Sequence, residues 1–319
     1  MAKYILKRLF LMLITASIII FLVFVIVKSL PNEMEVPLGM DAEAIQAWRD
    51  REGIGRPIIE QFGMWIRNIF ANGSFGISTN FSYDASLVLF PRIPATIKLN
   101  LIPTLLSIPI GIFLGSLAAI KKNKIADHAI STGVMIFISI PTFVIAMFAV
   151  LVFYFRLGWV SSDRVFPDVI FAENIWAGIQ SYILPVTIMT IGSIAGWTRG
   201  IRAELTEQLT QEYMLLARSK GLSKRQATLR HSLKNAMVPF APAIFTELIG
   251  LLTGSIIIES IFGVVGVGSV YLNALNQRDY PVLMLALLFF TVISLVSSVL
   301  ADLSYGIVDP RIRIGGKKA

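Results

Sequence analysis

The chain has 319 residues, of which 55% are hydrophobic and 15% charged, and its mean hydropathy is +0.73. This composition lies outside the range of soluble globular proteins and indicates an integral membrane protein. The absence of cysteine excludes disulfides, thiolate metal sites and thiol nucleophiles, and two histidines leave little room for another metal centre. The net charge of +8 is compatible with nucleic acid or with anionic lipid, so the positions of the charges must decide.

Six apolar stretches are long enough to cross a membrane, since a spanning helix needs roughly 20 apolar residues. They are Leu9–Leu30, Ala95–Ile120, Ala129–Phe155, Trp176–Thr198, Ala236–Ile258 and Val282–Val308. We therefore predict an all-α membrane protein with six transmembrane helices. The first stretch follows Lys3, Lys7 and Arg8 and has no small-x-small cleavage site before Pro31, so we interpret residues 1–30 as an uncleaved signal-anchor helix.

The basic residues are divided unequally between the two sides of the predicted spans. If the N-terminus is cytoplasmic, that side carries eighteen of the 28 Lys and Arg residues, in the segments Lys3–Arg8, Lys121–Lys124, Arg199–Lys234 and Arg311–Lys318. This bias predicts that both termini are cytoplasmic. The charge thus follows from topology and contact with membrane lipid, and because no basic stretch is interleaved with stacking aromatics, we expect no nucleic-acid binding.

One sizeable segment, residues 31–94, is predicted on the outer side. Asp41 is expected to cap a short helix that ends at Arg51, and Pro57 is suited to the first turn of a second, amphipathic helix that ends at Phe70. This segment is either a small lid over the ends of the spanning helices or a docking surface for an extracytoplasmic partner.

A long polar and basic segment, residues 199–235, separates two apolar spans on the inner side. Within it, Glu204–Lys220 is predicted to form one helix that ends at a left-handed Gly221. Ser223 and Gln226 have the spacing of a capping box and predict that a second helix begins there. The segment could be a solvated loop that only sets topology, but the caps, the glycine and the interspersed apolar residues favour a docking element.

The inner segment resembles a known motif. Its sequence ARSKGLSKRQATLRHSLKNAMVP is similar to the EAA loop of ABC-importer permeases, in the form found in the oligopeptide, dipeptide and nickel branch. Leu215, Leu216 and Lys234 stand where the general motif has Glu, Ala and Pro. The resemblance implies that the loop couples the permease to an ATPase through Glu212, Tyr213, Ala217, Arg218, Gly221, Leu222, Ser223, Arg230, His231, Leu233, Asn235 and Pro239.

Three further segments resemble the same branch in the same order along the chain. They are REGIGRPIIEQFGMWIRNIFANGSFGIS, PRIPATIKL, and NQRDYPVL followed by DPRIRI. The resemblance implies a type I importer bundle in a bacterial cell membrane, with a permease core over residues 95–308 that contains the coupling loop 199–235, and a cytoplasmic tail over residues 309–319. It also implies a second homologous permease, two ABC ATPase subunits and an extracytoplasmic solute-binding protein, with an oligopeptide, dipeptide or nickel chelate as substrate.

The sequence contains no phosphate-binding motif G-x-x-x-x-G-K-[ST], so the energy for transport is expected from a partner chain. Gly263, Gly266 and Gly268 are interpreted as an outer turn. No set of catalytic, metal-binding or cofactor-binding residues can be assembled, and the chain is not expected to be an enzyme.

Three acidic residues lie in or near the predicted spans: Glu247 in the middle of one, Glu259 at an outer end and Asp302 towards an inner end. Charged groups at membrane depth are unfavourable and often line cavities or pair internally. Glu247 could therefore belong to a translocation pathway or a subunit interface, or accept a local hydrogen bond, whereas Glu259 and Asp302 are interpreted as interfacial. A rival hypothesis makes Glu247 the ion site of a secondary transporter, and a third is a structural membrane-assembly subunit.

Prolines and glycines are also placed within the spans. Pro103, Pro109, Pro141 and Pro185 predict interruptions that would suit a gated pathway but are common in membrane helices. Three glycine pairs with i, i+4 spacing favour close packing between helices of the chain over packing with a partner. The pairs are Gly111/Gly115, Gly192/Gly196 and Gly250/Gly254.

Overall fold

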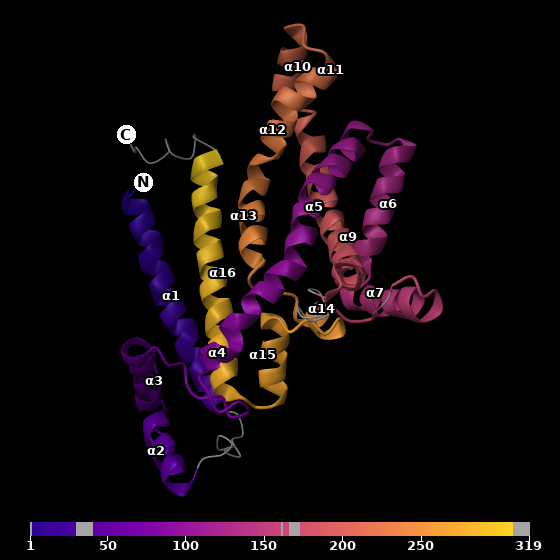
Figure 1. The fold of residues 1–319 in the computed structure, drawn as a ribbon. Helices are drawn as coiled ribbons and strands as arrows, with labels where there is room; N and C mark the ends of the chain where they lie inside the picture. The colour runs from indigo at the N-terminus through magenta and orange to yellow at the C-terminus, as the bar shows by residue number, and fades with distance from the viewer. Residues whose placement is uncertain (1, 30–40, 161, 166–172, 309–319) are drawn as a thin grey trace. The chain divides into compact units, whose positions relative to one another are not determined.

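The computed structural model of the chain describes residues 2–29, 41–160, 162–165 and 173–308 (Figure 1). Within these ranges all regular elements are helical, apart from one isolated antiparallel bridge between Ile77 and Asp84. The prediction of an all-α protein is thereby confirmed for the described chain. The predicted tail over residues 309–319 and the beginning of the outer segment, residues 31–40, lie outside the described residues.

The chain divides into two compact units. Unit 1 comprises residues 1–97, 252–260 and 264–299, and unit 2 comprises residues 98–251, 261–263 and 300–319. The boundary therefore falls inside α5 (Ile93–Ile120) and again near the end of α16 (Tyr280–Val308). The outer segment and the N-terminal helix belong to the same unit.

Four helices in the described chain are long and apolar enough to cross a membrane: Leu6–Ser29, Ala85–Ile120, Ile175–Gln208 and Tyr280–Ser304. A fifth span exists if the pair Ile125–Ser139 and Thr142–Arg156, which is bent by 92°, counts as one. Several apolar spans are thus present, while the number six and the sidedness of the termini stay predictions.

The bend in the third predicted span is located at Ile140 and Pro141, between α6 (Ile125–Ser139) and α7 (Thr142–Ala149). Ile140 is extended, with φ −97° and ψ 125°. A residue that precedes proline is driven out of the helical region, and proline has no N–H to continue the helix. By contrast, Pro103 and Pro109 in α5 and Pro185 in α9 (Ile175–Gln208) lie inside unbroken helices, so only Pro141 interrupts its span as predicted.

The stretch Ala236–Ile258 is not one helix. It contains the end of α12 (Leu233–Ala236), the 3₁₀ turn η4 (Val238–Phe240), α13 (Ala241–Gly250) and the beginning of α14 (Ile256–Ile261). The chain leaves α13 through a turn in which Gly254 has φ +70°, a left-handed conformation that other residues rarely adopt. The apolar composition of this stretch therefore did not reveal its break.

In unit 1 the outer segment forms α2 (Ala42–Glu52), α3 (Ile58–Asn72), α4 (Ala85–Leu89) and the short turn η1 (Phe90–Arg92). Asp41 Oδ1 accepts a hydrogen bond from Ala44 N at 2.8 Å, which confirms the predicted cap, and α3 begins directly after Pro57. The helices α4 and η1 were not predicted. Their short length and their proline left no periodic pattern to recognise.

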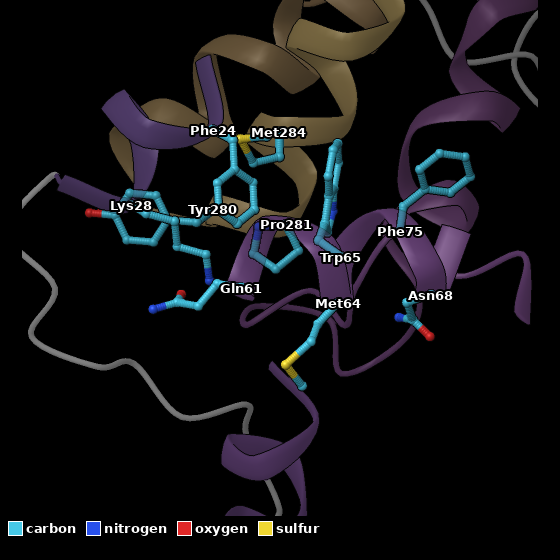
Figure 2. A pocket seen from close by; sticks show the side chains of 10 residues that line it. All are labelled: Phe24, Lys28, Gln61, Met64, Trp65, Asn68, Phe75, Tyr280, Pro281 and Met284. Atoms are coloured by element: carbon cyan, nitrogen blue, oxygen red, sulfur yellow. The ribbon is translucent and has the colours of Figure 1, made fainter. Parts of the chain in front are cut away.

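The core of unit 1 joins α3 to α1 (Ala2–Ser29) and α16, together with α4 and α15 (Val267–Asn276). The centroid of the Phe24 ring lies 5.3 Å from that of the Phe62 ring and 5.6 Å from that of the Trp65 ring. Figure 2 shows Phe24, Trp65, Tyr280 and Met284 around a small cavity of about 40 Å³ between these helices. This volume accommodates a few water molecules but no peptide, so the cavity is not a substrate site.

Two buried or partly buried aspartates fix the loop that follows α3. Asp279, which precedes α16, accepts hydrogen bonds from Ser78 Oγ and from Asn80 Nδ2, about 200 residues earlier in the chain. Asp84 Oδ2 accepts from Ser74 Oγ at 2.6 Å and from Phe75 N at 3.1 Å. Asp279 thus joins the outer motif SFGIS to the distant motif NQRDYPVL, and Asp84 fixes the local turn of the loop.

In unit 2, α9 is the helix on which α6 and α7 pack, and α5 approaches it at two glycines. A Cβ atom at Gly115 would lie 2.7 Å from Thr198 O, and one at Gly111 would overlap Trp197. Close packing within the chain is therefore confirmed for Gly111 and Gly115. A Cβ atom at Gly192 would have only Thr142 Oγ1 within 4 Å, at 3.9 Å, and one at Gly196 would have no such neighbour.

Candidate functional site

The polar segment begins on α9, which has 34 residues and includes Arg199 and Arg202. At 1.5 Å per residue α9 is about 50 Å long, whereas the hydrocarbon layer is roughly 30 Å thick. If α9 spans a membrane, its last turns must therefore extend beyond the hydrocarbon. This end of α9 is joined to α10 (Glu212–Ser219) and α11 (Lys224–Ala227), which form the tip seen in Figure 1.

The prediction of a single helix from Glu204 to Lys220 is wrong, because the chain breaks at Leu209–Gln211. Thr210 Oγ1 donates to Glu207 O at 2.8 Å, and Tyr213 Oη donates to Gln208 Oε1 at 2.8 Å. These bonds satisfy polar groups in the last turn of α9, where backbone carbonyls have no further helical partner. Gln211 is extended, with ψ 150°, and α10 begins after it at Glu212.

The turn between α10 and α11 agrees with the sequence. Gly221 has φ +87°, as expected for a left-handed residue after a helix. The Ser223 side chain accepts from Gln226 N at 3.3 Å, and the Gln226 side chain accepts from Ser223 N at 3.0 Å, which confirms the capping box. From Lys224 the helix continues through a π-helical turn, η3 (Thr228–Ser232), into α12.

The hairpin formed by α10 and α11 has a small core of its own. Met214, Ala217 and Ala227 are buried against each other, and Leu222 and Tyr213 pack around them. A second cluster, which contains Ala119, Leu205 and Ala236 with Leu209 and Leu233 packed against it, joins the base of the hairpin to α5 and α9. The hairpin is therefore a packed extension of these helices rather than a solvated loop.

The outer surface of α10 is unusual because it exposes two adjacent leucines. Leu215 is 67% exposed and Leu216 is 58% exposed, next to the exposed Arg218 and Lys220. Both leucines were recognised only as departures from the family motif, and neither was among the predicted contact residues. The signal was a pair of large apolar side chains in a basic segment, between Met214 and Ala217, which are both buried.

Two hollows flank α10. One, of about 800 Å³, is lined among others by Tyr213, Ala217, Leu222, His231, Asn235 and Pro239. The other, of about 550 Å³, is lined among others by Leu215, Arg218, Gly221 and Ser223. The structure therefore brings together most of the predicted residues; Glu212, Arg230 and Leu233 border neither hollow.

Glu247 lies in unit 2 on α13 and is only partly buried. Its carboxylate accepts hydrogen bonds from Ser193 Oγ at 2.9 Å and from Trp197 Nε1 at 2.6 Å. Both donors are on α9. The structure thus shows the local hydrogen bonding that the sequence left open.

The family named "Binding-protein-dependent transport system inner membrane component" matches residues 111–314, which include the hairpin and both hollows. The chain belongs to this family. It is therefore a multi-pass inner-membrane permease component of a transport system rather than an enzyme.

Named relatives of this permease cover almost its whole length. A dipeptide transport system permease protein of Lactococcus lactis is 30% identical over 98% of this chain and 100% of its own. An oligopeptide transport system permease protein of Bacillus subtilis is 31% identical over 98% of this chain and 99% of its own. A glutathione transport system permease protein of Shigella flexneri is 30% identical, also over 98% of this chain and 99% of its own.

Proposed function

We propose that this permease is the translocating subunit of an ATP-driven importer whose substrates are peptides. In support, the relatives named above serve dipeptide, oligopeptide and glutathione transport, and all three substrates are short peptides. Within this class the sequence resemblance favours oligopeptides. The ATP would be hydrolysed by partner chains.

The observation that carries the proposal is the exposed pair Leu215 and Leu216 on α10. Burying a leucine side chain contributes about 1.5–3 kcal/mol, so an exposed pair on a packed hairpin favours a protein partner. Arg218 and Lys220 lie beside the leucine pair, so the partner's complementary surface would be an apolar groove with acidic residues around it. We assign this groove to the ATPase, since the hairpin is joined through α9 and α5 to the apolar part of unit 2.

The proposal includes an assembly and a topology. The permease would pair with a second homologous permease, bind two ABC ATPases at the hairpins, and receive peptide from an extracytoplasmic solute-binding protein. Its six spans would leave both termini cytoplasmic, with residues 1–30 as the anchor helix, 31–94 as the outer segment, 95–308 as the core and 309–319 as a tail.

The test is to replace Leu215 and Leu216 by serine in a tagged permease expressed with its partner subunits. We expect at least a tenfold loss of co-purifying ATPase and of ATP-dependent uptake of a labelled peptide. The matched control is Leu229→Ser, because Leu229 is 52% exposed on η3 and borders neither hollow. This control should retain both the ATPase and the uptake.

Two results would count against the proposal. If the double variant binds the ATPase as the unaltered permease does, α10 is not the contact. If uptake by the unaltered permease persists without ATP and collapses with an uncoupler, the secondary transporter is favoured instead.

A further inference from the structure

The sequence predicts that Glu259 lies at the membrane interface, and in the structure its side chain is buried within the protein. It lies on α14 in unit 1 and has no exposed surface. Its Oε1 accepts a hydrogen bond from Thr96 Oγ1 at 2.9 Å, and its Oε2 accepts one from Ser269 N at 2.9 Å. The beginning of α5 and the beginning of α15, of which the former is 163 residues away in the sequence, therefore meet at one carboxyl group.

The same contacts cap the beginning of α15. The N-cap residue of this helix is Gly266, which has no side chain to accept the free N–H groups of the first turn. Val267 N instead donates to Thr96 Oγ1 at 2.8 Å, and Ser269 N donates to Glu259. Thr96 and Glu259 thus supply from α5 and α14 the cap that α15 lacks.

Glycines surround this contact and leave no room for a side chain. A Cβ atom at Gly254 or Gly266 would overlap the Glu259 carboxyl group, and one at Gly268 would lie 3.0 Å from Glu259 Oε2. The glycines that the sequence suggested to form an outer turn therefore also allow the backbone to close around the carboxyl group.

The position of the contact relative to the unit boundaries gives it a further role. The chain passes from unit 1 to unit 2 after Ile97, returns at Leu252 and leaves again after Ser260. Thr96 lies directly before the first of these crossings, Gly254 shortly after the second, and Glu259 directly before the third. The Thr96–Glu259–Ser269 contact, which we call the latch, lies within unit 1 and holds together the segments at three of the five places where the chain passes between the units.

We propose that Glu259 is a positioning residue for transport. Two compact units of one chain are expected to move relative to each other unless a large apolar interface prevents it. Such a movement is transmitted only where packed or hydrogen-bonded segments cannot bend locally. The latch stiffens the crossings, so that a movement driven by ATP in unit 2 shifts α15 and its neighbours in unit 1 as one body.

The inference rests on the proposed function, and its test uses the full complex in proteoliposomes with the binding protein and a radiolabelled pentapeptide. Glu259→Gln replaces an acceptor oxygen by an amide donor, and Thr96→Val removes the hydroxyl group at nearly constant volume. We expect both variants to hydrolyse ATP while the peptide imported per ATP falls at least tenfold. Thr96→Ser, which keeps the hydroxyl group, should retain the ratio of the unaltered complex.

The outcomes separate the two proposals. Uptake by the unaltered complex without ATP would contradict the proposed function. If the unaltered complex couples uptake to ATP, and the peptide imported per ATP is unchanged in Glu259→Gln and Thr96→Val, only the proposal about the latch would be contradicted. If Glu259→Gln does not fold, Thr96→Val decides; a Thr96→Val variant that also fails to fold, or that loses hydrolysis and uptake in proportion, would show a purely structural role and overturn the inference.

Discussion

Arg202 on α9 and Asp127 on α6 form a two-pronged ion pair, with Arg202 Nε 2.6 Å from Asp127 Oδ1 and Arg202 Nη2 2.9 Å from Asp127 Oδ2. Asp127 is 1% exposed, and it also accepts hydrogen bonds from Asn123 N at 2.9 Å and Ser131 Oγ at 3.2 Å. The pair therefore joins α6 and the turn before it to the helix that carries the hairpin.

Arg202→Gln should destabilise the permease by about 3–5 kcal/mol, because it leaves a buried carboxylate without its cation. We place the effect towards the lower end of that range, since the Arg202 side chain is 34% exposed and partly screened by solvent. The measurement is equilibrium unfolding in mixtures of detergent and sodium dodecyl sulfate. The double variant Asp127→Asn/Arg202→Gln should lose less than the sum of the single losses, and simple additivity would contradict a direct interaction.

Gly115→Ala should separate α5 from α9. The added Cβ would lie 2.7 Å from Thr198 O and 2.8 Å from Ile201 Cβ, and a backbone oxygen cannot move aside cheaply. We expect a loss of about 1–3 kcal/mol in the same unfolding measurement.

Gly196→Ala provides the matched control, because nothing lies within 4 Å of a Cβ atom there. Its effect should be neutral or stabilising by up to about 1 kcal/mol, as alanine favours the helix. Equal losses at Gly115 and Gly196 would show that the helix contact is not the cause.

The features that the sequence predicted correctly are local ones. The Asp41 cap, the left-handed Gly221 and the Ser223–Gln226 capping box are each determined by residues within three or four positions. The close approach at Gly111 and Gly115 was also predicted, because a small residue leaves a surface on which another helix can pack. The caps and the left-handed glycine need no knowledge of the distant chain.

The features that the sequence did not predict depend on distant or competing contacts. Glu259 is buried at a place where Thr96, 163 residues away, and the backbone of Ser269 both donate to it and offset the cost of burial. The break after Gln208 depends on hydrogen bonds from Thr210 and Tyr213 that compete with a continuous helix. Hydropathy alone also could not show that the apolar stretch before Glu259 is divided at Gly254.

Asp84 should make the stability of unit 1 depend on pH. Partial burial alone would raise the pKa of its carboxyl group, but hydrogen bonds from Ser74, from Ser86 and from Phe75 N outweigh this effect and lower the pKa below 3.8. A lowered pKa in the folded state means that the carboxylate stabilises the fold in full above pH 3.8, and that this contribution is lost as the pH falls through the folded value.

The measurement compares the thermal unfolding midpoints of the unaltered permease and of Asp84→Asn at pH 6 and pH 3. Asp84→Asn should lower the midpoint at pH 6, and the difference between the two proteins should shrink at pH 3. A difference that is constant or larger at pH 3 would show that the carboxylate form is not the stabilising one.

Gly221→Val should uncouple peptide uptake from ATP hydrolysis if the hairpin transmits the movement of the ATPase. The residue has φ +87° and no heavy atom within 4 Å of a Cβ position, so the strain arises from the backbone conformation and not from a clash. A β-branched residue strongly disfavours this conformation, whereas asparagine tolerates it. Valine should therefore change the angle between α10 and α11, and asparagine should preserve it.

The test measures the peptide imported per ATP hydrolysed by complexes that contain Gly221→Val or Gly221→Asn. We expect at least a tenfold decrease for valine and a value near that of the unaltered complex for asparagine. Coupled uptake in the valine variant would show that the angle of the hairpin is not needed. A loss in both variants would instead indicate that the ATPase contacts the backbone at Gly221 directly, where any side chain would obstruct it.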